Sequence, residues 1–439
     1  MDVNDLIEAS KKSTKRIAVI GDPMIDEWVE GVVGHCQDHC WKITQGGQPR
    51  RTPGGAANAA WQLEAHWNVR VTRLGLWNKL PTCPVKRRFT GEQGRIVFRH
   101  DEGEGTNYGL SKQGLADFRA AALAKLKMEE WDGVLISDYD KGLLDRETIN
   151  AIMDYCCEKK VPCVIDAKRD QNFYRGRSWG YQSWPVIKAN YAWKERFLGS
   201  TYAPTVITRG SEPPWIYAPG ETRQPVSTQP VHCINHVGAG DCFAAHLALC
   251  LAHGMSLEDA VPVAHAAGRV YVQHPFNRAP WPHEIRKDLM PALGKHVWRE
   301  QMRELRESLP GKKIVFTNGV FRLPHAGHAW LFDWAAKQGD VLVVGFNTIP
   351  DQAHAGKYSM SIDERLTIIT AMQSVDWLVG FHEETPESLI RELRPDVLVK
   401  GHEYKDERIP GDDIVKDVRF APESPFPAHA SHIIEAIKR

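Results

Sequence analysis

Residues 238–253 read GAGDCFAAHLALCLAH. Two glycines, an aspartate and then an unbroken apolar stretch predict a glycine turn that opens a buried helix. The N–H groups at the start of a helix have no partner within the helix, so this turn forms an anion hole. Asp241 beside it can take a proton from an attacking hydroxyl while the hole stabilises a transferring phosphate. The alternative is a glycine turn with a capping aspartate and no chemistry.

Two earlier segments also place polar residues at the ends of expected elements. A strand runs into GDPMID (21–26), which puts Asp26 past the carboxyl end of that strand, where α/β sheets bind ligands. Gly54 and Gly55 precede Asn58 at the start of a helix, so a ligand can approach the backbone there and bond to the amide. Each segment alone has a structural alternative, a capped turn or close helix packing, but their occurrence together in this order favours a ligand site.

Short apolar runs alternate with helical patterns along the whole chain. This rhythm predicts an α/β fold of mostly parallel sheets with helices on both faces. In the first half we expect strands at 16–21, 132–137, 161–166 and 204–208, and helices at 111–127, 145–159, 239–253 and 256–273. In the second half we expect strands at 312–317, 340–346, 375–379 and 396–400, and helices at 327–337, 361–372 and 385–393. A charged stretch followed by Pro310-Gly311 predicts domains at 1–299 and 312–439, joined by a linker at 300–311.

The second half carries two histidines, His325 and His328, between an expected strand and helix. Their spacing places both imidazoles on one face of the first helical turn. Gly327 between them carries no side chain that would block a phosphate, and the helix start supplies N–H groups and positive potential. Such a site can bind a nucleoside triphosphate and stabilise charge on its α-phosphate and on departing pyrophosphate. A pair of zinc ligands is the alternative, but zinc would require a third ligand.

Composition narrows the class of protein. The 439 residues contain 55 Lys+Arg and 55 Asp+Glu, so no overall basic charge attracts nucleic acid or an anionic membrane. We expect no signal peptide and no membrane-spanning segment, which favours a cytoplasmic enzyme. The nine scattered cysteines suit reduced thiols. The cluster HCQDHC (35–40) has metal-ligand residue types, but no second Cys/His pair follows at zinc-site spacing, so we expect no metal site.

The three segments of the first half resemble the ribokinase-like (PfkB) sugar kinase family. The resemblance implies a doubly wound sheet with a small β lid, Asp241 as the catalytic base, and sugar binding by Asp26 and the stretch Gly54–Asn58. The anion hole would comprise Gly238, Ala239 and Gly240. The segments SDYDKG (137–142), IDAKRD (165–170) and IKAN (187–190) are similar to heptose 7-phosphate kinases. That similarity implies that Asp138 and Lys141 belong to the substrate site. It also implies that Lys168 and Asn190 face the phosphates of the nucleotide.

The second half resembles the HxGH nucleotidyltransferase superfamily, which implies a Rossmann-like domain. Further matching segments are SIDERL (361–366), AMQSVDWLVGF (371–381), TPESLI (385–390) and LRPDVLVKGHEY (393–404). By position, His325 and His328 act on the triphosphate, Arg365 and Lys400 contact phosphates, and Phe321 and Asn347 lie near the nucleotide. The alternative for Arg365 is an exposed salt bridge with Asp363 or Glu364 on its own helix.

The order of the halves resembles a family of bifunctional enzymes that join a heptose 7-phosphate kinase to a heptose 1-phosphate adenylyltransferase. This resemblance implies ATP and Mg²⁺ as cofactors, sugar phosphates as substrates and a homodimer through the kinase domain. Two positions depart from the pattern: Trp193 replaces the Glu of an N-x-x-E motif that organises Mg²⁺, and Arg322 replaces an Asp. Two alternatives therefore remain, an enzyme with only one active half and a sugar-phosphate or nucleotide sensor.

Overall fold

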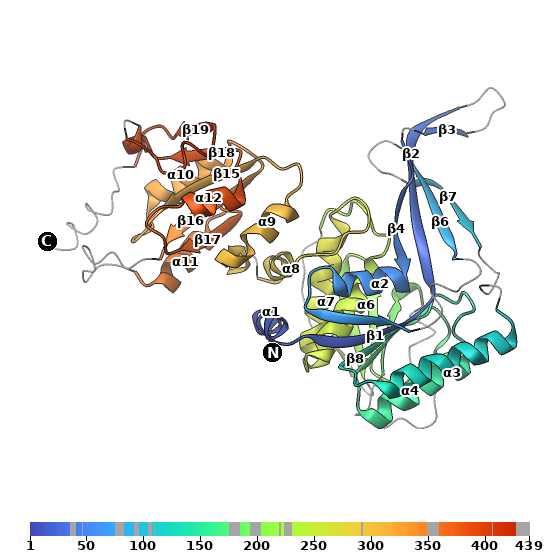
Figure 1. Ribbon diagram of the computed structural model, residues 1–439. Coiled ribbons are helices and arrows are strands. Elements are labelled where there is room, and N and C mark those ends of the chain that lie inside the picture. The colour runs from blue at the N-terminus through green and yellow to red at the C-terminus, as the bar shows by residue number, and fades with distance from the viewer. Residues whose placement is uncertain are drawn as a thin grey trace. The chain divides into compact units, whose positions relative to one another are not determined.

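In the computed structural model, the chain divides into two compact units, Met1–Ile285 and Arg286–Arg439 (Figure 1). The structure describes residues 1–35, 41–45, 47–74, 83–91, 96–103, 108, 110–174, 185–193, 203–218, 221–223, 231–290, 293–348, 360–405 and 407–426. Most of the HCQDHC cluster therefore lies outside the described residues. Within these ranges, no helix combines the length and the apolar character that a membrane crossing needs.

An eight-stranded sheet, in the order β13-β12-β11-β10-β9-β8-β1-β5, forms the centre of the first unit. Neighbouring strands from β5 to β11 run parallel, and β12 and β13 add an antiparallel edge. The strands are β1 (Lys15–Gly21), β5 (Val69–Arg73), β8 (Gly133–Ser137), β9 (Cys163–Asp166), β10 (Val186–Asn190), β11 (Thr205–Arg209), β12 (Glu212–Ala218) and β13 (Glu221–Arg223). Because the central strands are parallel, their carboxyl ends meet at one edge, where a ligand site is expected.

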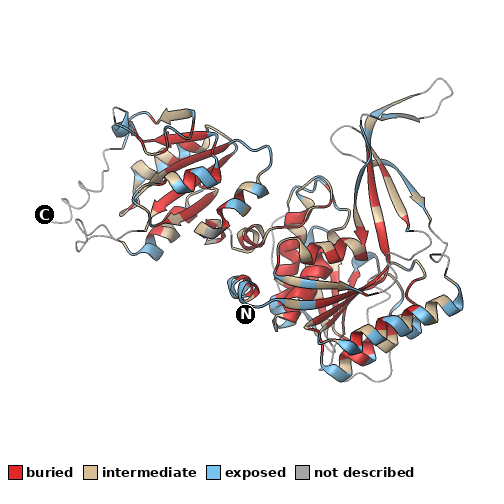
Figure 2. Ribbon diagram, viewed as in Figure 1, coloured by how far each residue is buried: buried red, intermediate tan, exposed pale blue. Residues whose placement is uncertain are grey.

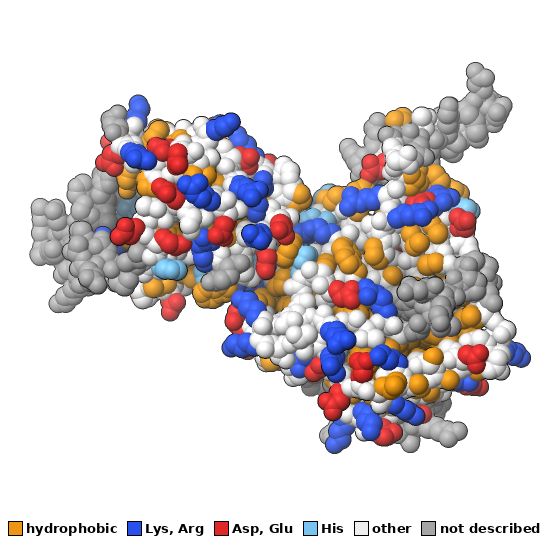
Figure 3. Space-filling model, in the orientation of Figure 1, with side chains coloured by type: hydrophobic (Ala, Val, Ile, Leu, Met, Phe, Trp, Pro, Cys, Tyr) orange, Lys and Arg blue, Asp and Glu red, His pale blue; other side chains and the backbone are white. Residues whose placement is uncertain are grey.

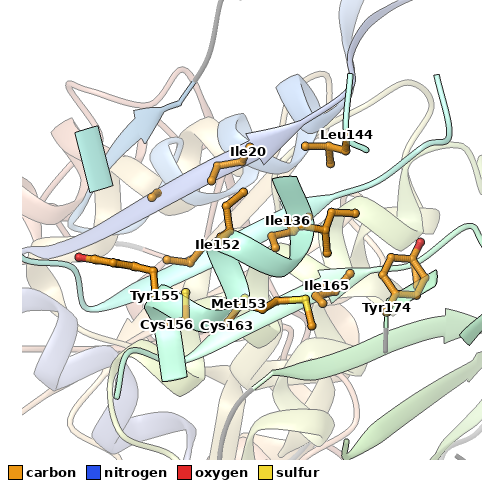
Figure 4. Packing of buried hydrophobic residues seen from close by; sticks show 14 of the residues in the cluster. Ile20, Ile136, Leu144, Ile152, Met153, Tyr155, Cys156, Cys163, Ile165 and Tyr174 are labelled. Atoms are coloured by element: carbon orange, nitrogen blue, oxygen red, sulfur yellow. The ribbon is translucent and has the colours of Figure 1, made fainter. Parts of the chain in front are cut away.

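Helices cover both faces of this sheet (Figures 1 and 2). They are α1 (Val3–Lys12), α2 (Ala56–Glu64), α3 (Lys112–Met128), α4 (Arg146–Lys159), α6 (Ala239–Ala252) and α7 (Leu257–Val272). A further helix, α8 (Pro282–Leu289), spans the boundary between the two units. On one face, Ile152 and Met153 of α4 pack against Ile136 and Ile165 of the sheet (Figure 4). On the other face, α6 is buried from Asp241 to its end and packs against α2 and α7. Full burial explains why α6 has no polar stripe in its sequence.

A second sheet forms the expected β lid. It comprises β2 (Pro23–His35), β3 (Trp41–Gln45), β4 (Arg50–Gly55), β6 (Val85–Thr90) and β7 (Ile96–Glu102). The order is β3-β2-β6-β7, with β4 paired to β2. Only Asp22 separates the end of β1 from the start of β2, so the lid leaves the main sheet at the carboxyl end of a central strand.

The second unit has a six-stranded, fully parallel sheet in the order β14-β17-β16-β15-β18-β19. Its strands are β14 (His296–Val297), β15 (Ile314–Gly319), β16 (Val341–Asn347), β17 (Trp377–Phe381), β18 (Val397–Lys400) and β19 (Asp417–Phe420). Its helices are α9 (Met302–Ser308), α10 (Ala326–Ala336), α11 (Ile362–Ala371) and α12 (Glu387–Leu393). One apolar core includes residues of α9 and α12, and another includes residues of α10 and α11, so the sheet is covered on both faces. The predicted fold, a ribokinase-like domain followed by a Rossmann-like domain, is confirmed.

The boundary between the units differs from the expected one. The segment expected as a linker, 300–311, contains α9, whose Met302 and Leu305 are fully buried in a core of the second unit. Upstream of α9, β14 pairs with β17. The buried positions of α9 were not predicted because the helix has few apolar residues among many charged ones, and its charges lie on the exposed side.

Candidate active sites

The candidate base of the first unit lies at the start of α6, and both of its oxygens are hydrogen-bonded. The Tyr139 hydroxyl donates to Oδ1 of Asp241 at 2.5 Å, and Nδ2 of Asn58 donates to Oδ2 at 3.0 Å. Asp241 is 2% exposed. Burial and then the charge of Asp166 raise the pKa of Asp241 to about 6, while the two hydrogen bonds oppose that rise. A carboxylate with this pKa is suited to proton transfer near neutral pH.

The glycines before Asp241 are required by close packing. A Cβ at Gly238, whose φ is +84°, would lie 2.3 Å from the Tyr271 hydroxyl. A Cβ at Gly240 would lie 2.8 Å from Nζ of Lys188. The Ala239 N–H donates to the carbonyl of His236 at 3.3 Å, so within the predicted anion hole this group already has a partner. The Gly240 segment therefore passes directly over a lysine ammonium, which adds positive charge to the hole.

Two lysines share one carboxylate beneath this turn. Nζ of Lys188 lies 2.9 Å from Oδ1 of Asp166, and Nζ of Lys168 lies 3.3 Å from the same oxygen. Burial raises the pKa of Asp166, but the charges of the two lysines outweigh burial and hold that pKa below its usual value. Burial lowers the pKa of Lys188, which is fully buried. The sequence indicated Lys168, whereas Lys188 was missed because a lysine inside a strand gives no signal of its environment.

The expected sugar-binding side contains a buried ion pair. Nη1 of Arg88, on β6, lies 2.6 Å from Oδ1 of Asp26. Nδ2 of Asn277 donates to Oδ2 of Asp26 at 3.2 Å, and a Cβ on Gly54 would lie 2.8 Å from that oxygen. Gly55 ends β4 with a φ of +56°. Arg88 and Asn277 had no motif to mark them, and the lid brings Arg88 to Asp26 by pairing β6 with β2.

Several predicted residues have hydrogen-bond partners within the first unit. Asp138 is fully buried, and its Oδ2 accepts a 2.7 Å bond from the Tyr174 hydroxyl, so its expected substrate contact has no support in this geometry. Burial raises the pKa of Asp138 to about 6. The N–H of Lys141 donates to Oδ2 of Asp22 at 3.3 Å. Asp22 therefore caps the turn that follows β8, in line with the capped turn given as the alternative for segment 21–26. Asn190 is exposed, and its Oδ1 accepts from the Thr208 hydroxyl.

A basic pocket of about 300 Å³ lies beside Lys168. Its lining residues are Asp140, Arg146, Lys168, Arg169, Asp170, Asn172 and Phe173. Arg169 pairs with Asp140 at 2.7 Å and lies over the Phe173 ring at 4.1 Å from the centroid. Three cationic side chains around one pocket suit a phosphate ligand.

In the second unit, the two histidines stack at the start of α10. Nδ1 of His325 accepts from the N–H of Gly327 at 3.1 Å, and Nδ1 of His328 accepts from the N–H of His325 at 3.3 Å. Because both Nδ1 atoms accept, each neutral ring carries its proton on Nε2. The ring centroids lie 3.9 Å apart, and the Phe321 edge meets the His328 ring at 5.0 Å. The backbone thus fixes both imidazoles as donors at the helix start, as the HxGH interpretation requires.

A pocket of about 400 Å³ opens beside these histidines. Its lining residues are His325, Gly327, His328, Trp330, Leu331, Gly401, His402, Glu403, Ala421, Pro422, Glu423, Ser424 and Phe426. They come from α10 and from the carboxyl ends of β18 and β19. Trp330, His402 and Glu403 were not predicted as site residues, although the last two lie within the matching segment LRPDVLVKGHEY (393–404).

The other predicted residues of this half lie along the neighbouring strand ends. Nζ of Lys400 donates to Oδ1 of Asn318 at 2.6 Å, and burial lowers the pKa of Lys400 to about 8. Arg365 is 6% exposed and donates to the carbonyls of Val320 (2.8 Å) and Asn347 (3.3 Å). The alternative of an exposed salt bridge on its own helix is therefore wrong for Arg365. Its buried Nε has no hydrogen-bond partner among the described residues, which leaves a donor for a ligand.

The described residues contain no cluster of three His, Cys, Asp or Glu side chains that fits a bound metal. Oδ2 of Asp166 is buried without a hydrogen-bond partner, however, and a carboxylate oxygen is the ligand type that Mg²⁺ prefers. The side chain of Trp193 lies outside the described residues. On the face shown in Figure 3, basic and acidic side chains are interspersed, which agrees with the balanced composition.

Comparison with known proteins finds a related domain in each half of the chain. The pfkB family carbohydrate kinase model matches residues 193–284, which include the Asp241 turn, and the Cytidylyltransferase-like model matches residues 316–433, which include both histidines. The chain therefore combines a PfkB-type kinase domain with a cytidylyltransferase-like domain, and both belong to classes of transferase. The chain is similar to proteins named bifunctional protein HldE.

The similarity to HldE extends over most of the chain. The protein of that name from Pseudomonas paraeruginosa is 28% identical over 91% of this chain and 92% of its own length. The Gluconobacter oxydans protein is 29% identical over the same shares of the two chains. Among solved structures, Arabidopsis thaliana ribokinase complexed with ribose and ATP aligns with 63% of this chain and 99% of its own, at 15% identity and a TM-score of 0.43.

Proposed function

We propose that the chain makes an ADP-heptose in two separate reactions. The first unit transfers the γ-phosphate of ATP to the anomeric hydroxyl of a heptose 7-phosphate. The second unit joins a heptose 1-phosphate to the AMP part of ATP and releases pyrophosphate. A separate phosphatase acts between the steps, because the kinase product carries two phosphates and the second substrate carries one. The observation that supports this most is the pairing of a buried base with a glycine turn in one unit and an HxGH helix start in the other.

In the kinase step, Asp241 takes the proton of the anomeric hydroxyl as its oxygen attacks the γ-phosphorus and ADP leaves. The carboxylate is the active form. Although its pKa is raised to about 6, Asp241 is still largely ionised at pH 7. The Gly238–Gly240 turn, with Lys188 and Lys168 nearby, stabilises charge on the transferring phosphoryl group. Asp26 and Asn58 would bond the sugar hydroxyls.

In the adenylyl step, the phosphate of the sugar attacks the α-phosphorus of ATP, so no protein nucleophile is needed. His325 and His328 present Nε2–H donors to the charge that builds up on the α-phosphate and on pyrophosphate. Lys400 and Arg365 add positive charge at the strand ends beside the pocket. The pocket beside the two histidines has a volume of about 400 Å³, which is large enough for a nucleotide.

Mg²⁺ would shield the phosphate charges in both reactions. In the first unit, Asp166 would hold it through its unpartnered Oδ2. A cytoplasmic location suits ATP as the substrate. We also propose a homodimer through the lid, since Val32, Val97 and Phe98 of β2 and β7 are 64%, 43% and 56% exposed and would be covered by a partner.

A second candidate is an enzyme in which only the adenylyltransferase half is active, because Trp193 replaces the expected Glu in the first unit. Incubation with ATP, Mg²⁺ and a heptose 7-phosphate separates the two proposals. Formation of a heptose bisphosphate supports the bifunctional enzyme. Absence of that product, with ADP-heptose still formed from a supplied heptose 1-phosphate, supports the second candidate.

A further inference from the structure

Each oxygen of the candidate base in the first unit already accepts a hydrogen bond from the protein. Oδ2 of Asp241 is held by Asn58, whose own Oδ1 accepts a 3.1 Å bond from Gln62 and is thereby fixed. Oδ1 is held by the Tyr139 hydroxyl at 2.5 Å. A general base must accept the proton of the attacking hydroxyl at one of its oxygens. Asp241 is also only 2% exposed, so an incoming hydroxyl reaches its oxygens only when a neighbouring group moves. Of the two partners, the phenol is the one whose hydroxyl has no second anchor among the described residues.

Tyr139 is held at its backbone and placed between charges. Its N–H donates to Oδ2 of Asp22 at 2.7 Å, which fixes the start of the side chain. Its ring has Nζ of Lys86 at 5.1 Å and Nζ of Lys168 at 4.9 Å from the centroid. Lys86 belongs to lid strand β6, and Lys168 follows β9. The ring thus lies where the lid, the phosphate side and the base meet.

We propose that Tyr139 is a positioning residue that closes Asp241 to water until the hydroxyl of the sugar displaces the phenol. This inference rests on the proposed kinase function of the first unit. The reaction it suppresses is hydrolysis: a water oxygen bonds to the γ-phosphorus, the bond from that phosphorus to the bridging oxygen of ADP breaks, and the water proton passes to Asp241. While the phenol covers Oδ1 and Asp241 stays 2% exposed, a water molecule cannot approach either oxygen closely enough to pass that proton.

The surroundings of Asp241 limit what else could control its protonation. The titratable or charged groups that face Asp241 or its phenol partner are, by element, Asp26 on β2, Lys86 on β6, Tyr139 after β8, Asp166 and Lys168 at and after β9, Lys188 on β10, Cys242 on α6 and Tyr271 on α7. Of these, Tyr139 is the group whose side chain donates a hydrogen bond to the carboxylate. Removing its hydroxyl therefore isolates one contribution while leaving the charges in place.

Tyr139→Phe and Tyr155→Phe form a matched pair for the test. The Tyr155 hydroxyl is also engaged in a short bond, to the carbonyl of Leu126 at 2.6 Å, but it contacts no described residue of the candidate site. Two quantities are measured on the full-length protein: inorganic phosphate released from ATP without sugar, and the titration of Asp241 by ¹³C NMR, assigned by its loss in Asp241→Asn. Thermal unfolding of each variant confirms that it is folded.

The proposal predicts that Tyr139→Phe raises sugar-independent phosphate release about tenfold, the effect of losing one hydrogen bond to a charged group. It also predicts that Asp241 titrates above the wild-type pKa of about 6, whereas Tyr155→Phe changes neither quantity. An unchanged release rate or an unchanged Asp241 titration in folded Tyr139→Phe overturns the proposal. If the wild-type protein phosphorylates no sugar phosphate, the proposed kinase function fails, and the titration alone then decides the role of Tyr139.

Discussion

Nζ of Lys188 lies 2.9 Å from Oδ1 of Asp166, with both side chains buried beside the first turn of α6. Lys168 contacts the same oxygen, so two ammonium groups lie near Gly240, where Asp166 and Asp241 balance their charge. Ammonium groups held in this way stabilise the charge that develops on a transferring phosphoryl group. The arrangement is therefore suited to a site that receives an anionic phosphoryl group.

Lys188→Met is expected to destabilise the protein by about 3–5 kcal/mol, because it leaves Asp166 buried without its closest partner. Lys15→Met is the control, since Lys15 forms a 2.9 Å ion pair with Asp132 that is partly exposed to solvent. That control should cost only about 0–1 kcal/mol. Denaturant unfolding measures both, and equal losses in the two variants would contradict a special role for the Lys188 pair.

The pH dependence of sugar phosphorylation should report Asp241. The carboxylate is the active form, and its pKa is raised to about 6, so the rate should fall as pH decreases through about 6. Above that value the rate should be flat until another group titrates. The measurement is kcat/KM for the sugar phosphate across pH 4.5 to 9. An acid limb centred near 4, the ordinary value for an aspartate, would show that burial does not tune this base.

Arg88→Met is expected to weaken sugar binding and to destabilise the first unit by about 3–5 kcal/mol, because Asp26 is left buried with only Asn277. Arg51→Met is the matched control, since Arg51 is largely exposed and Glu27 retains Arg87 as a partner. Isothermal titration with the sugar phosphate and denaturant unfolding compare the two. Similar behaviour of both variants would remove the argument that the lid stabilises the sugar site through Arg88.

Adenylylation should weaken at alkaline pH through Lys400. Its pKa is lowered to about 8, so the ammonium is charged below that pH and neutral above it. KM for ATP should rise as pH increases through about 8 in the wild type. Lys400→Arg keeps its charge across this range and should remove the rise. A KM that does not change between pH 7 and 9 in the wild type would mean that Lys400 makes no phosphate contact.

Sequence patterns predicted the repeated strands and helices of both units because their apolar periodicity is strong. Asp241, His325 and His328 were predicted because glycine turns and helix starts have a local chemical meaning. Partners that come from distant segments were not predictable in this way. Arg88 contacts Asp26 because the lid strands β2 and β6 pair, and Lys188 lies near Gly240 because α6 packs on the sheet. Neither contact could be predicted from the spacing of residues along the sequence.

The boundary between the units was misplaced for a related reason. Residues 294–309 are highly charged and read as a surface helix next to a Pro-Gly turn. Met302 and Leu305 nevertheless provide enough apolar surface to pack α9 into the core of the second unit. A short helix needs only two or three buried apolar residues to pack into a core. The overall composition of a charged segment does not show where these residues lie.

The most direct test is a product assay by mass spectrometry on the wild type, Asp241→Asn and His325→Ala/His328→Ala. Each protein receives ATP and Mg²⁺, with a heptose 7-phosphate in one tube and a heptose 1-phosphate in another. The wild type should form a heptose bisphosphate in the first tube and an ADP-heptose in the second. Asp241→Asn should lose only the bisphosphate, and the histidine variant should lose only the ADP-heptose. Absence of both products from the wild-type reactions, or loss of both in a single variant, would contradict two independent transferase sites in one chain.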